Sequence, residues 1–358
     1  MAGVSATAVS LALNDHPRIG QATKHRIRQI AEALHYRPNY VARSLVSSKS
    51  HTLGLVITTI TNPFYPELAK GIEDKAMELG YTIILCSTNY DASHQRRLID
   101  ILRSKGVDGI IFSSVEINDP SIRGLVEDSF PFVLVNRRLL EPTIEEKVDY
   151  VVLDNFSGGY MAVNHLTSLG HRTVAIVAGP FSTSTAFERT QGARKAFDDG
   201  GESIDPRFIV ECGFSKQKAY EAAKYLLSLQ PPPTAIFAEN DYMALGVREA
   251  VLDSGLRIPE DMALVGFDDI EASAVRGVEI TTVNQKKYEM GSLAVEILVH
   301  KIENKGASVR QVVLNPEMII RKSCGYGTPR AKGPDEPGRT AIDRPAAFLR
   351  DPRGSAVI

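Results

Sequence analysis

The chain has 358 residues, of which 43% are hydrophobic and 23% charged, and its formal net charge is −2 at pH 7. This composition is that of a globular protein long enough for two or three domains. No apolar stretch reaches the length that spans a bilayer, so no membrane association is expected. The charge is unevenly distributed, because residues 1–51 carry a formal charge of +5 and the remainder carries −7. A basic segment ahead of an acidic body is typical of a segment that contacts phosphate, although a solvated surface explains the charge equally well.

The first predicted element is a short helix that begins after Ser5, a residue type that caps helix N-termini. Val4, Val9 and Leu13 give this helix apolar residues at near-helical spacing. Such a helix is typical of the second helix of a helix-turn-helix, which enters a DNA groove. A secretory signal is a weaker interpretation, since no basic segment precedes the apolar residues.

Two further helices are predicted before the sequence pattern changes at Leu53. Residues 22–35 form an amphipathic helix, with Ile27 on its apolar face and Lys24 among the residues of its polar face. Pro38 ends that helix, and Asn39 can cap a short helix that extends to about residue 46. Isolated short helices are marginal in water, so this last helix is expected to need a partner outside its own chain.

From Leu53 onward, apolar strand-like runs alternate with amphipathic helices. The runs lie at 52–58, 82–87, 109–114, 131–136, 150–155, 173–179, 234–240 and 262–268, and the helices at 66–79, 94–105, 158–169, 186–199, 216–229 and 241–254. Continuous apolar strands separated by helices predict parallel sheets that are covered on both faces. The fold class is therefore expected to be α/β, with two doubly wound parallel-sheet subdomains that change near Asn155, preceded by a small all-α head. Ligands of such units bind outside the carboxyl ends of the strands.

The remaining features of the sequence mostly argue against particular structures and activities. The three cysteines, Cys86, Cys212 and Cys324, lie far apart without metal-ligand spacing, which predicts free thiols in a reducing cytoplasm. Residues 324–358 are rich in Pro, Gly and charge and are predicted to form a disordered tail. Motifs of nucleotide-binding loops, nucleophile elbows and zinc proteases are missing, so neither an enzyme, a cofactor nor a metal is expected.

Several motifs in order carry a resemblance to a known family. They include "GVSATAVSLALN", "LHYRPNYVARSL", "NPFYPELAKGIE", "DNFSGGYMAVNHLTSLGHRTVAIVAGP", "ERTQGARKAF", "AENDYMALGV", "IPEDMALVGFDD" and "TTVNQKKYEMG". Over residues 2–323 the chain resembles the bacterial lactose/galactose-repressor (LacI/GalR) family. The resemblance implies a body with the type I periplasmic-binding fold, in which the chain crosses between the two subdomains three times.

The resemblance also implies a division of the chain. Its parts are a helix-turn-helix head at 1–38, a hinge helix and linker at 39–51, and an effector-binding and dimerisation domain at 52–323, with subdomains at 52–155 plus 284–307 and at 156–283 plus 308–323. In the family a first helix precedes the "AGVS" motif, and the sequence has none. The head is therefore expected to be incomplete, and its operator binding to be weak and strongly salt-dependent.

The residues that the family uses to contact DNA match positions in the head and hinge. Leu45 matches the residue that wedges between base steps of the minor groove and kinks the duplex. The implied DNA-binding residues are Ser5, Ala6, Thr7, Ala8, Ser10, Asn14, Asn39, Arg43 and Leu45.

The residues that match the family's effector site combine a guanidinium, a carboxylate, amides, hydroxyls and aromatic faces. Such a set suits a polyhydroxylated or heterocyclic ligand, because hydroxyls need paired donors and acceptors and sugar faces pack on rings. The implied effector-binding residues are Phe64, Tyr65, Asn136, Thr183, Thr185, Arg189, Phe214, Asn240, Asp268 and Gln285.

The sequence therefore predicts a ligand-responsive transcription regulator of the cytoplasm, most simply a repressor. It is expected to bind a roughly palindromic operator as a homodimer, and to bind a small molecule, a saccharide, in a cleft whose closure changes the fit to DNA. Two alternatives stay open: a periplasmic-type solute-binding protein or effector-binding module that has lost DNA binding, and a dinucleotide-dependent enzyme. The basic head argues against the first, and the missing glycine fingerprint argues against the second.

Overall fold

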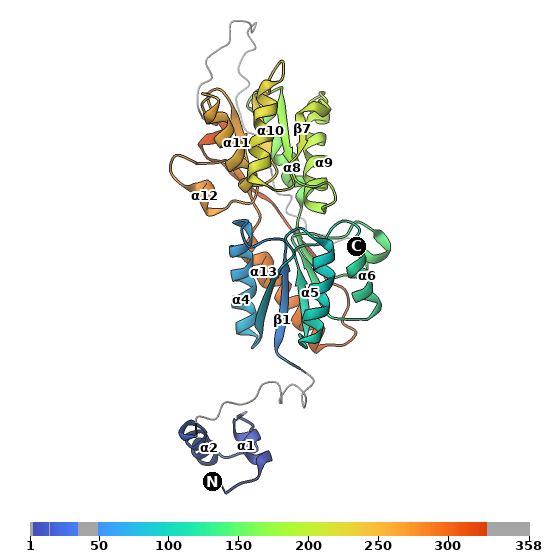
Figure 1. The fold of residues 1–358 in the computed structure, drawn as a ribbon, viewed down its shortest axis with the longest axis vertical. Coiled ribbons are helices and arrows are strands. Elements are labelled where there is room, and N and C mark those ends of the chain that lie inside the picture. The colour runs from blue at the N-terminus through green and yellow to red at the C-terminus, as the bar shows by residue number, and fades with distance from the viewer. Residues whose placement is uncertain (1–2, 14, 35–48, 328–358) are drawn as a thin grey trace, which may run out of the picture. The chain divides into compact units, whose positions relative to one another are not determined.

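The computed structural model describes residues 3–13, 15–34 and 49–327 (Figure 1). The predicted hinge helix and the predicted tail from residue 328 lie outside the described residues. The DNA-contact roles of Asn14, Asn39, Arg43 and Leu45 also fall there and stay predictions.

The head consists of helices α1 (Ala6–Leu13) and α2 (Gln21–Ala33). The hydroxyl of Ser5 accepts a hydrogen bond from the backbone N–H of Ala8 at 3.2 Å, which confirms Ser5 as the helix cap. Ala12 and Ile27 are buried where the two helices pack. Lys24, which was expected on the polar face, is buried as well, because its ammonium donates to the backbone oxygen of Asp15 and pairs with the Asp15 carboxylate, each at 2.9 Å.

The first subdomain of the body is built on a six-stranded parallel sheet in the order β11-β5-β4-β3-β1-β2. Its strands are β1 (Thr52–Ile57), β2 (Thr82–Ser87), β3 (Gly109–Phe112), β4 (Phe132–Val135), β5 (Tyr150–Leu153) and β11 (Gln311–Leu314). Successive side chains of a strand point to opposite faces, so Leu55 and Ile57 join one core while Val56 joins the other.

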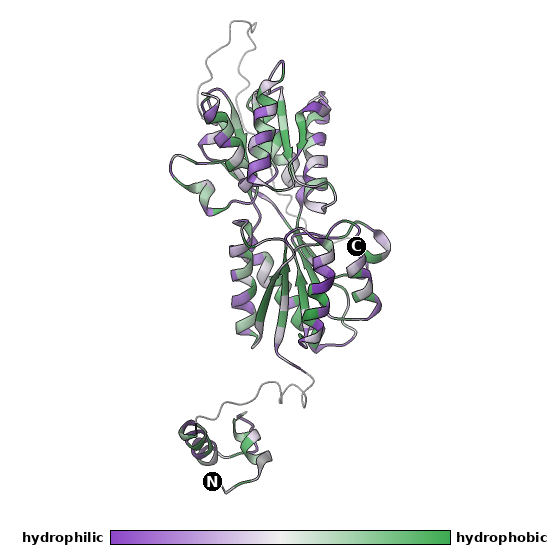
Figure 2. Cartoon of the chain, in the orientation of Figure 1, coloured by the Kyte–Doolittle hydropathy of each residue, from purple (hydrophilic) through white to green (hydrophobic). Residues whose placement is uncertain are grey.

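Helices cover both faces of this sheet (Figures 1 and 2). α4 (Phe64–Glu78) and α13 (Lys287–Glu303) contribute to the core that contains Leu55, whereas α5 (Ala92–Ser104) and α6 (Pro120–Glu127) contribute to the core that contains Val56. The strands are largely hydrophobic and the helices present hydrophilic residues outward (Figure 2), as a doubly wound unit requires. A short helix, α7 (Pro142–Glu145), precedes β5.

The second subdomain repeats this plan on a four-stranded parallel sheet in the order β7-β6-β8-β9. Its strands are β6 (Val174–Ala178), β7 (Ile209–Glu211), β8 (Ala235–Ala238) and β9 (Ala263–Val265), and its helices are α8 (Asn155–Ser168), α9 (Ser184–Asp199), α10 (Lys216–Ser228) and α11 (Asp241–Asp253). α8 and α9 contribute to one core, and α10 and α11 to the other. The predicted α/β class with two doubly wound units is confirmed.

The chain passes between the two sheets three times. It does so between β5 and α8, between β10 (Thr282–Asn284) and α13, and between β11 and β12 (Glu317–Ile319), which pairs with β10 in a small antiparallel sheet. The sequence placed 308–323 in the second subdomain, and this is wrong for β11, which pairs with β5 in the first sheet. β11 was missed because it is a four-residue strand with alternating exposed and half-buried residues at the edge of the sheet.

The predicted start of the tail at 324 is also too early. Cys324 ends a short 3-10 helix (Lys322–Cys324) and is buried, with its sulfur 3.1 Å from the Thr281 hydroxyl. All three cysteines carry free thiols. Among the helices of the described ranges, none combines the length and the apolar character that a bilayer crossing requires.

Candidate ligand-binding cleft

A polar cavity lies where loops from the two subdomains meet. Residues that follow β1 and β4 of the first sheet line it together with residues that follow β8 and β9 of the second, so the carboxyl ends of the strands point toward it. Its lining residues are Thr58, Asn62, Phe64, Tyr65, Tyr90, Asn136, Arg137, Thr185, Arg189, Phe214, Asn240, Asp268 and Gln285. The free space in it is about 20 Å³, room for about one water molecule, so a larger ligand can enter only if the two walls move apart.

All of the implied effector-site residues except Thr183 line this cavity. Thr183 instead caps α9, because its hydroxyl accepts from the backbone N–H of Ala186 at 3.4 Å and donates to the backbone oxygen of Pro180 at 2.8 Å. Its side chain lines a second, larger cavity next to the first. Thr183 therefore borders the outer part of the cleft and not the central cavity, and its contact with an effector stays a prediction.

Sequence reasoning missed four lining residues, Thr58, Asn62, Tyr90 and Arg137. Thr58 ends the predicted strand at 52–58 and Arg137 comes directly after the predicted strand at 131–136, which is a usable signal because ligands of doubly wound units bind at such strand ends. Tyr90 follows β2 by three residues and Asn62 precedes α4. None of the four belongs to the matched effector positions.

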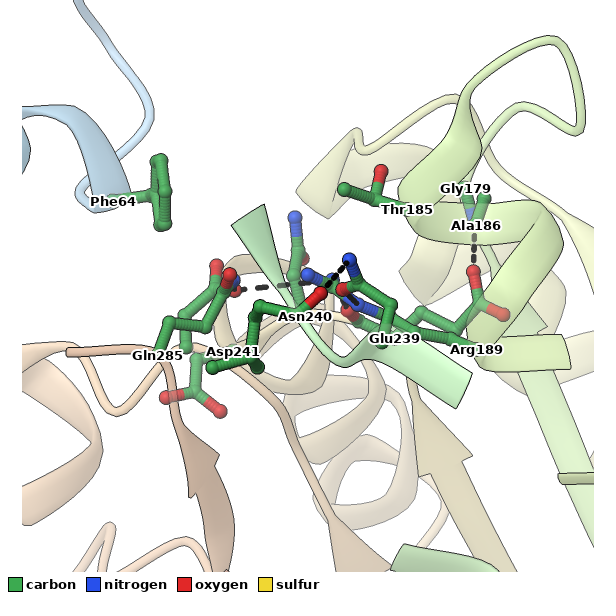
Figure 3. A network of polar contacts seen from close by, with 12 residues as sticks. Phe64, Gly179, Thr185, Ala186, Arg189, Glu239, Asn240, Asp241 and Gln285 are labelled. Atoms are coloured by element: carbon green, nitrogen blue, oxygen red, sulfur yellow. Dashed lines mark hydrogen bonds and ion pairs between the residues drawn. The ribbon is translucent and has the colours of Figure 1, made fainter. Parts of the chain in front are cut away.

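Aromatic side chains form part of the wall on each side. Phe64 and Tyr65 begin α4, and their rings meet edge to face with centroids 5.2 Å apart. The Tyr65 hydroxyl is held by the Thr58 hydroxyl at 2.6 Å. Phe214 lines the cavity from the second subdomain. Figure 3 shows Phe64 on one side of the open centre and Thr185 on the other, with Asn240 and Gln285 between them.

Arg189 is the central cation of the second subdomain, and its side chain is 2% exposed. Its Nε donates to the Asn155 side-chain oxygen at 2.9 Å, another nitrogen donates to the backbone oxygen of Glu239 at 2.5 Å, and the Asp268 carboxylate lies at 3.9 Å. Burial lowers the pKa of Arg189, and the carboxylates of Asp268 and Glu239 oppose that effect. The guanidinium also stacks 3.7 Å from the ring centre of Phe267.

Three acids of the second subdomain, Glu239, Asp241 and Asp268, are buried. Burial raises the pKa of Glu239 to about 8, that of Asp241 to about 7 and that of Asp268 to about 6. Glu239 accepts from the Thr190 hydroxyl at 2.6 Å and from the Gly179 N–H at 2.8 Å (Figure 3). Of the three, only Asp268 lines the cavity, where the side-chain amide of Gln285 donates to it.

The backbone at the cavity adopts conformations that are rare outside glycine. Asn136, Phe214 and Asp268 have φ values of 68°, 57° and 116°. Non-glycine residues pay a conformational cost at positive φ, and such residues gather at functional sites. These three positions therefore support the assignment of the cavity as a site.

Several buried polar atoms at the cavity have no hydrogen-bond partner in the structure. They are the side-chain oxygens of Asn136 and Gln285 and the Nε of Arg137. A buried polar atom without a partner costs about 1–3 kcal/mol. A ligand that donates to the two oxygens and accepts from Arg137 would remove that cost.

The implied DNA-contact residues of the head lie on or just before α1. Ser5, Thr7 and Ser10 are exposed and Ala8 is half-buried, while Ala6 is the first residue of the helix. Exposed short polar side chains at a helix start can reach base edges or phosphates. Their contact with DNA stays a prediction.

Comparison with known proteins connects the two parts of the chain. The family described as periplasmic binding proteins and sugar binding domain of LacI family matches residues 50–322, and the family described as bacterial regulatory proteins, lacI family, matches residues 1–39.

Individual relatives match over nearly their whole length. The HTH-type transcriptional repressor PurR of Haemophilus influenzae (strain PittEE) is 33% identical over 90% of this chain and 96% of its own. The HTH-type transcriptional regulator DegA of Bacillus subtilis (strain 168) is 34% identical over 90% of this chain and 95% of its own. Among solved structures, the complex of the transcriptional regulator CelR with cellobiose superposes with a TM-score of 0.72, at 30% identity over 90% of this chain and 97% of that chain.

The helical head and the cleft between two doubly wound subdomains are the two parts that these family matches predict. The chain belongs to the LacI family of bacterial regulators and is a ligand-responsive, DNA-binding transcriptional regulator.

Proposed function

We propose that this regulator is a repressor that binds operator DNA as a homodimer and releases or tightens its hold when a polyhydroxylated small molecule, a saccharide, occupies the cleft. The observation that carries the proposal is the convergence of the matched residues on one cavity between the subdomains. A ligand that contacts both walls favours one relation of the subdomains over another, and this differential affinity is what couples the ligand to DNA.

The polar groups of the cleft favour a saccharide over a flat, hydrophobic ligand. The side-chain oxygens of Asn136 and Gln285 and the carboxylate of Asp268 are all acceptors, which suits a ligand with several hydroxyl donors. Phe64 and Phe214 supply apolar faces for a sugar ring. CelR, a relative at 30% identity, is described in complex with cellobiose, which supports the same ligand class here.

The homodimer is supported by an apolar edge of the first sheet. β2 is an edge strand, and its Ile84 and Leu85 are 37% and 44% exposed. Met77 at the end of α4 and Ile101 in α5 are also exposed. A bare apolar edge strand invites pairing with another chain, and we propose a second copy as that partner. Sedimentation of the full chain should give a dimer, and Leu85→Lys a monomer. Val309→Lys, at a 39% exposed position just before β11, is the matched control.

DNA binding is proposed for the exposed residues of α1 together with the residues of the predicted hinge. Selection of the full chain on a random duplex pool should enrich a motif with two-fold symmetry, because a symmetric dimer reads two equivalent half-sites. Titration of a bound saccharide should then change the affinity for that motif measurably by fluorescence anisotropy. A pool without an enriched motif would contradict the proposal for DNA, and an affinity that no cleft ligand changes would contradict the proposed coupling.

A further inference from the structure

An apolar groove lies outside the cleft, where the chain crosses from β5 to α8. Its volume is about 320 Å³, which is within the range of small-molecule pockets. Arg138, Leu140 and Val313 line it from the first subdomain, and Phe156 and Phe187 line it from the second. None of its lining residues lines the central cavity or the larger cavity next to that one. The groove is therefore separate from the site described above.

The groove exposes aromatic side chains to solvent. Phe156 is the second residue of α8 and Phe187 lies in the first turn of α9, and their side chains are 43% and 40% exposed. Val313, in the edge strand β11, is exposed next to them. Single exposed apolar side chains are normal, but several that meet in one hollow are typical of a binding surface. Since β11 and β2 are opposite edges of the first sheet, a dimer that pairs through β2 leaves this groove uncovered.

The charges at the groove are mostly negative. The guanidinium of Arg138 is shared by two carboxylates, that of Glu188 at 2.6 Å and that of Glu145 at 2.5 Å. The Asp154 carboxylate also lines the groove and accepts from the backbone N–H and the hydroxyl of Ser157, at 2.9 and 2.6 Å. Among the described residues, no cation lies within ion-pair distance of Asp154. Three carboxylates around one guanidinium leave a net negative charge.

The two acids that line the groove would both gain from a further positive charge. Burial raises the pKa of Glu188, and the nearby Asp154 carboxylate adds to this effect although Arg138 opposes it. The existing cation therefore does not fully compensate the negative charge. A ligand cation in the groove would lie near both carboxylates and would stabilise their ionised forms.

These features select one class of ligand. Aromatic faces attract cations within about 6 Å of the ring centre, and the carboxylates attract the same charge. An anion would be repelled, and a neutral apolar ligand would gain nothing from Asp154. We propose that the groove is a second ligand site and that it binds an organic ammonium with an apolar body, such as an arylalkylammonium. The proposal is independent of the saccharide in the cleft, because the two sites share no residue.

The test uses the full chain and three probes that differ in charge on the same ring system. They are 1-naphthylmethylammonium, 1-naphthalenemethanol and 1-naphthylacetate, compared by thermal shift and then by calorimetry. We expect the ammonium to bind about tenfold more tightly than the alcohol, because the ring faces and the Asp154 carboxylate act on the charge alone. The acetate should not bind measurably. Tetramethylammonium, which lacks the apolar body, should bind more weakly than the naphthyl cation.

Variants connect the preference for the cation to the groove. Phe156→Leu and Phe187→Leu keep the apolar bulk but remove the aromatic face, so each should lower the preference for the ammonium over the alcohol. Phe181→Leu is the matched control, since Phe181 is exposed in the loop before α9 and does not line the groove. It should leave the preference intact.

A second pair of variants tests the charge. Asp154→Asn keeps a side-chain cap for α8 and should lower the affinity for the ammonium severalfold without changing that for the alcohol. Asp205→Asn is its control, because Asp205 caps the short 3-10 helix Pro206–Phe208 far from the groove, and it should change neither affinity.

Three results would overturn the proposal. The first is an alcohol that binds as tightly as the ammonium, which would make the groove a neutral apolar site. The second is ammonium binding that all the groove variants leave unchanged, or no binding of any probe. The third is a monomer on sedimentation of Phe187→Lys, with Leu85→Lys still a dimer, which would show that a second copy of the chain covers the groove.

Discussion

The two walls of the cleft differ in how completely their polar groups are paired. On the second subdomain, Arg189 contacts the Asn155 side chain, the backbone oxygen of Glu239 and the Asp268 carboxylate. The side-chain oxygen of Asn240 accepts from the backbone N–H of Met243 at 2.7 Å and so caps α11. On the first subdomain, the Asn136 side-chain oxygen and the Arg137 Nε are buried without partners. One wall is held in place by its own contacts, whereas the other keeps open hydrogen-bonding positions for a ligand.

This difference separates two ways in which a buried residue contributes to a binding site. A fully paired group is fixed before the ligand arrives, so little ordering remains when binding occurs. An unpaired buried group lowers the stability of the free protein and recovers that cost on binding. Substitutions of the paired groups should therefore act mainly on stability, and substitutions of the unpaired groups mainly on affinity.

The largest effect is expected for Arg189→Met. This change leaves the Asp268 carboxylate without its buried cation and the backbone oxygen of Glu239 without its donor, and breaking a buried pair costs about 3–5 kcal/mol of the free energy of unfolding. Urea denaturation measures it. Arg137→Met is the matched control and should leave the stability unchanged or raise it, because no partner is stranded. Equal losses in the two variants would show that Arg137 is as firmly paired as Arg189.

The second-largest expected effect is a pH dependence of the free energy of unfolding that comes from Glu239. Since burial raises its pKa to about 8 from 4.5, the folded protein holds a proton that the unfolded chain releases above about pH 4.5. The stability from this group is therefore complete below pH 4.5 and is lost as the pH rises through 8, at up to about 1.4 kcal/mol per pH unit. Glu239→Gln should remove this fall between pH 5 and 8, and Glu211→Gln, at an exposed position, should not. Parallel curves for all three proteins would contradict the raised pKa.

A binding effect without a stability effect is expected for Asn136→Gly. Glycine accepts the φ of 68° at this position and removes only the amide. The affinity for the effector, measured by calorimetry, should fall by about 1–3 kcal/mol while the free energy of unfolding changes by less. Asn89→Gly, at a φ of 52° in a loop outside the cavity, is the control and should leave the affinity unchanged. A large loss of stability in Asn136→Gly would show that the Asn136 side chain has stabilising contacts in the free protein, as Arg189 does.

The same contrast explains what the sequence could and could not predict. Arg189, Asp268 and Phe64 were found because they lie in motifs that match the family, and the strands were found from continuous apolar runs. Arg137 was missed because a cation after a strand looks like a solvated loop residue, and only the structure shows that it is buried without a partner. Lys24 was misplaced for the opposite reason, since its helical position is polar but Asp15 draws its ammonium into the head.

Thr183 illustrates a limit of assigning site residues by resemblance alone. It stands two residues from Thr185 at the start of the same helix, yet Thr185 lines the central cavity and Thr183 caps α9. A cap directs its oxygen to the backbone of its own helix, so neighbours in sequence can serve different purposes at a helix start.

The smallest effect is therefore expected for Thr183→Ala. Loss of a threonine cap costs about 1 kcal/mol of stability, and the affinity for the effector should stay the same because the side chain does not reach the central cavity. Thr183→Ser keeps an oxygen at the cap and should restore most of the stability, as thermal denaturation would report. Thr185→Ala is the counterpart, since it removes a hydroxyl that lines the central cavity and should weaken binding. If Thr183→Ala instead lowered the affinity as much as Thr185→Ala, the effector would extend past the central cavity to the cap of α9.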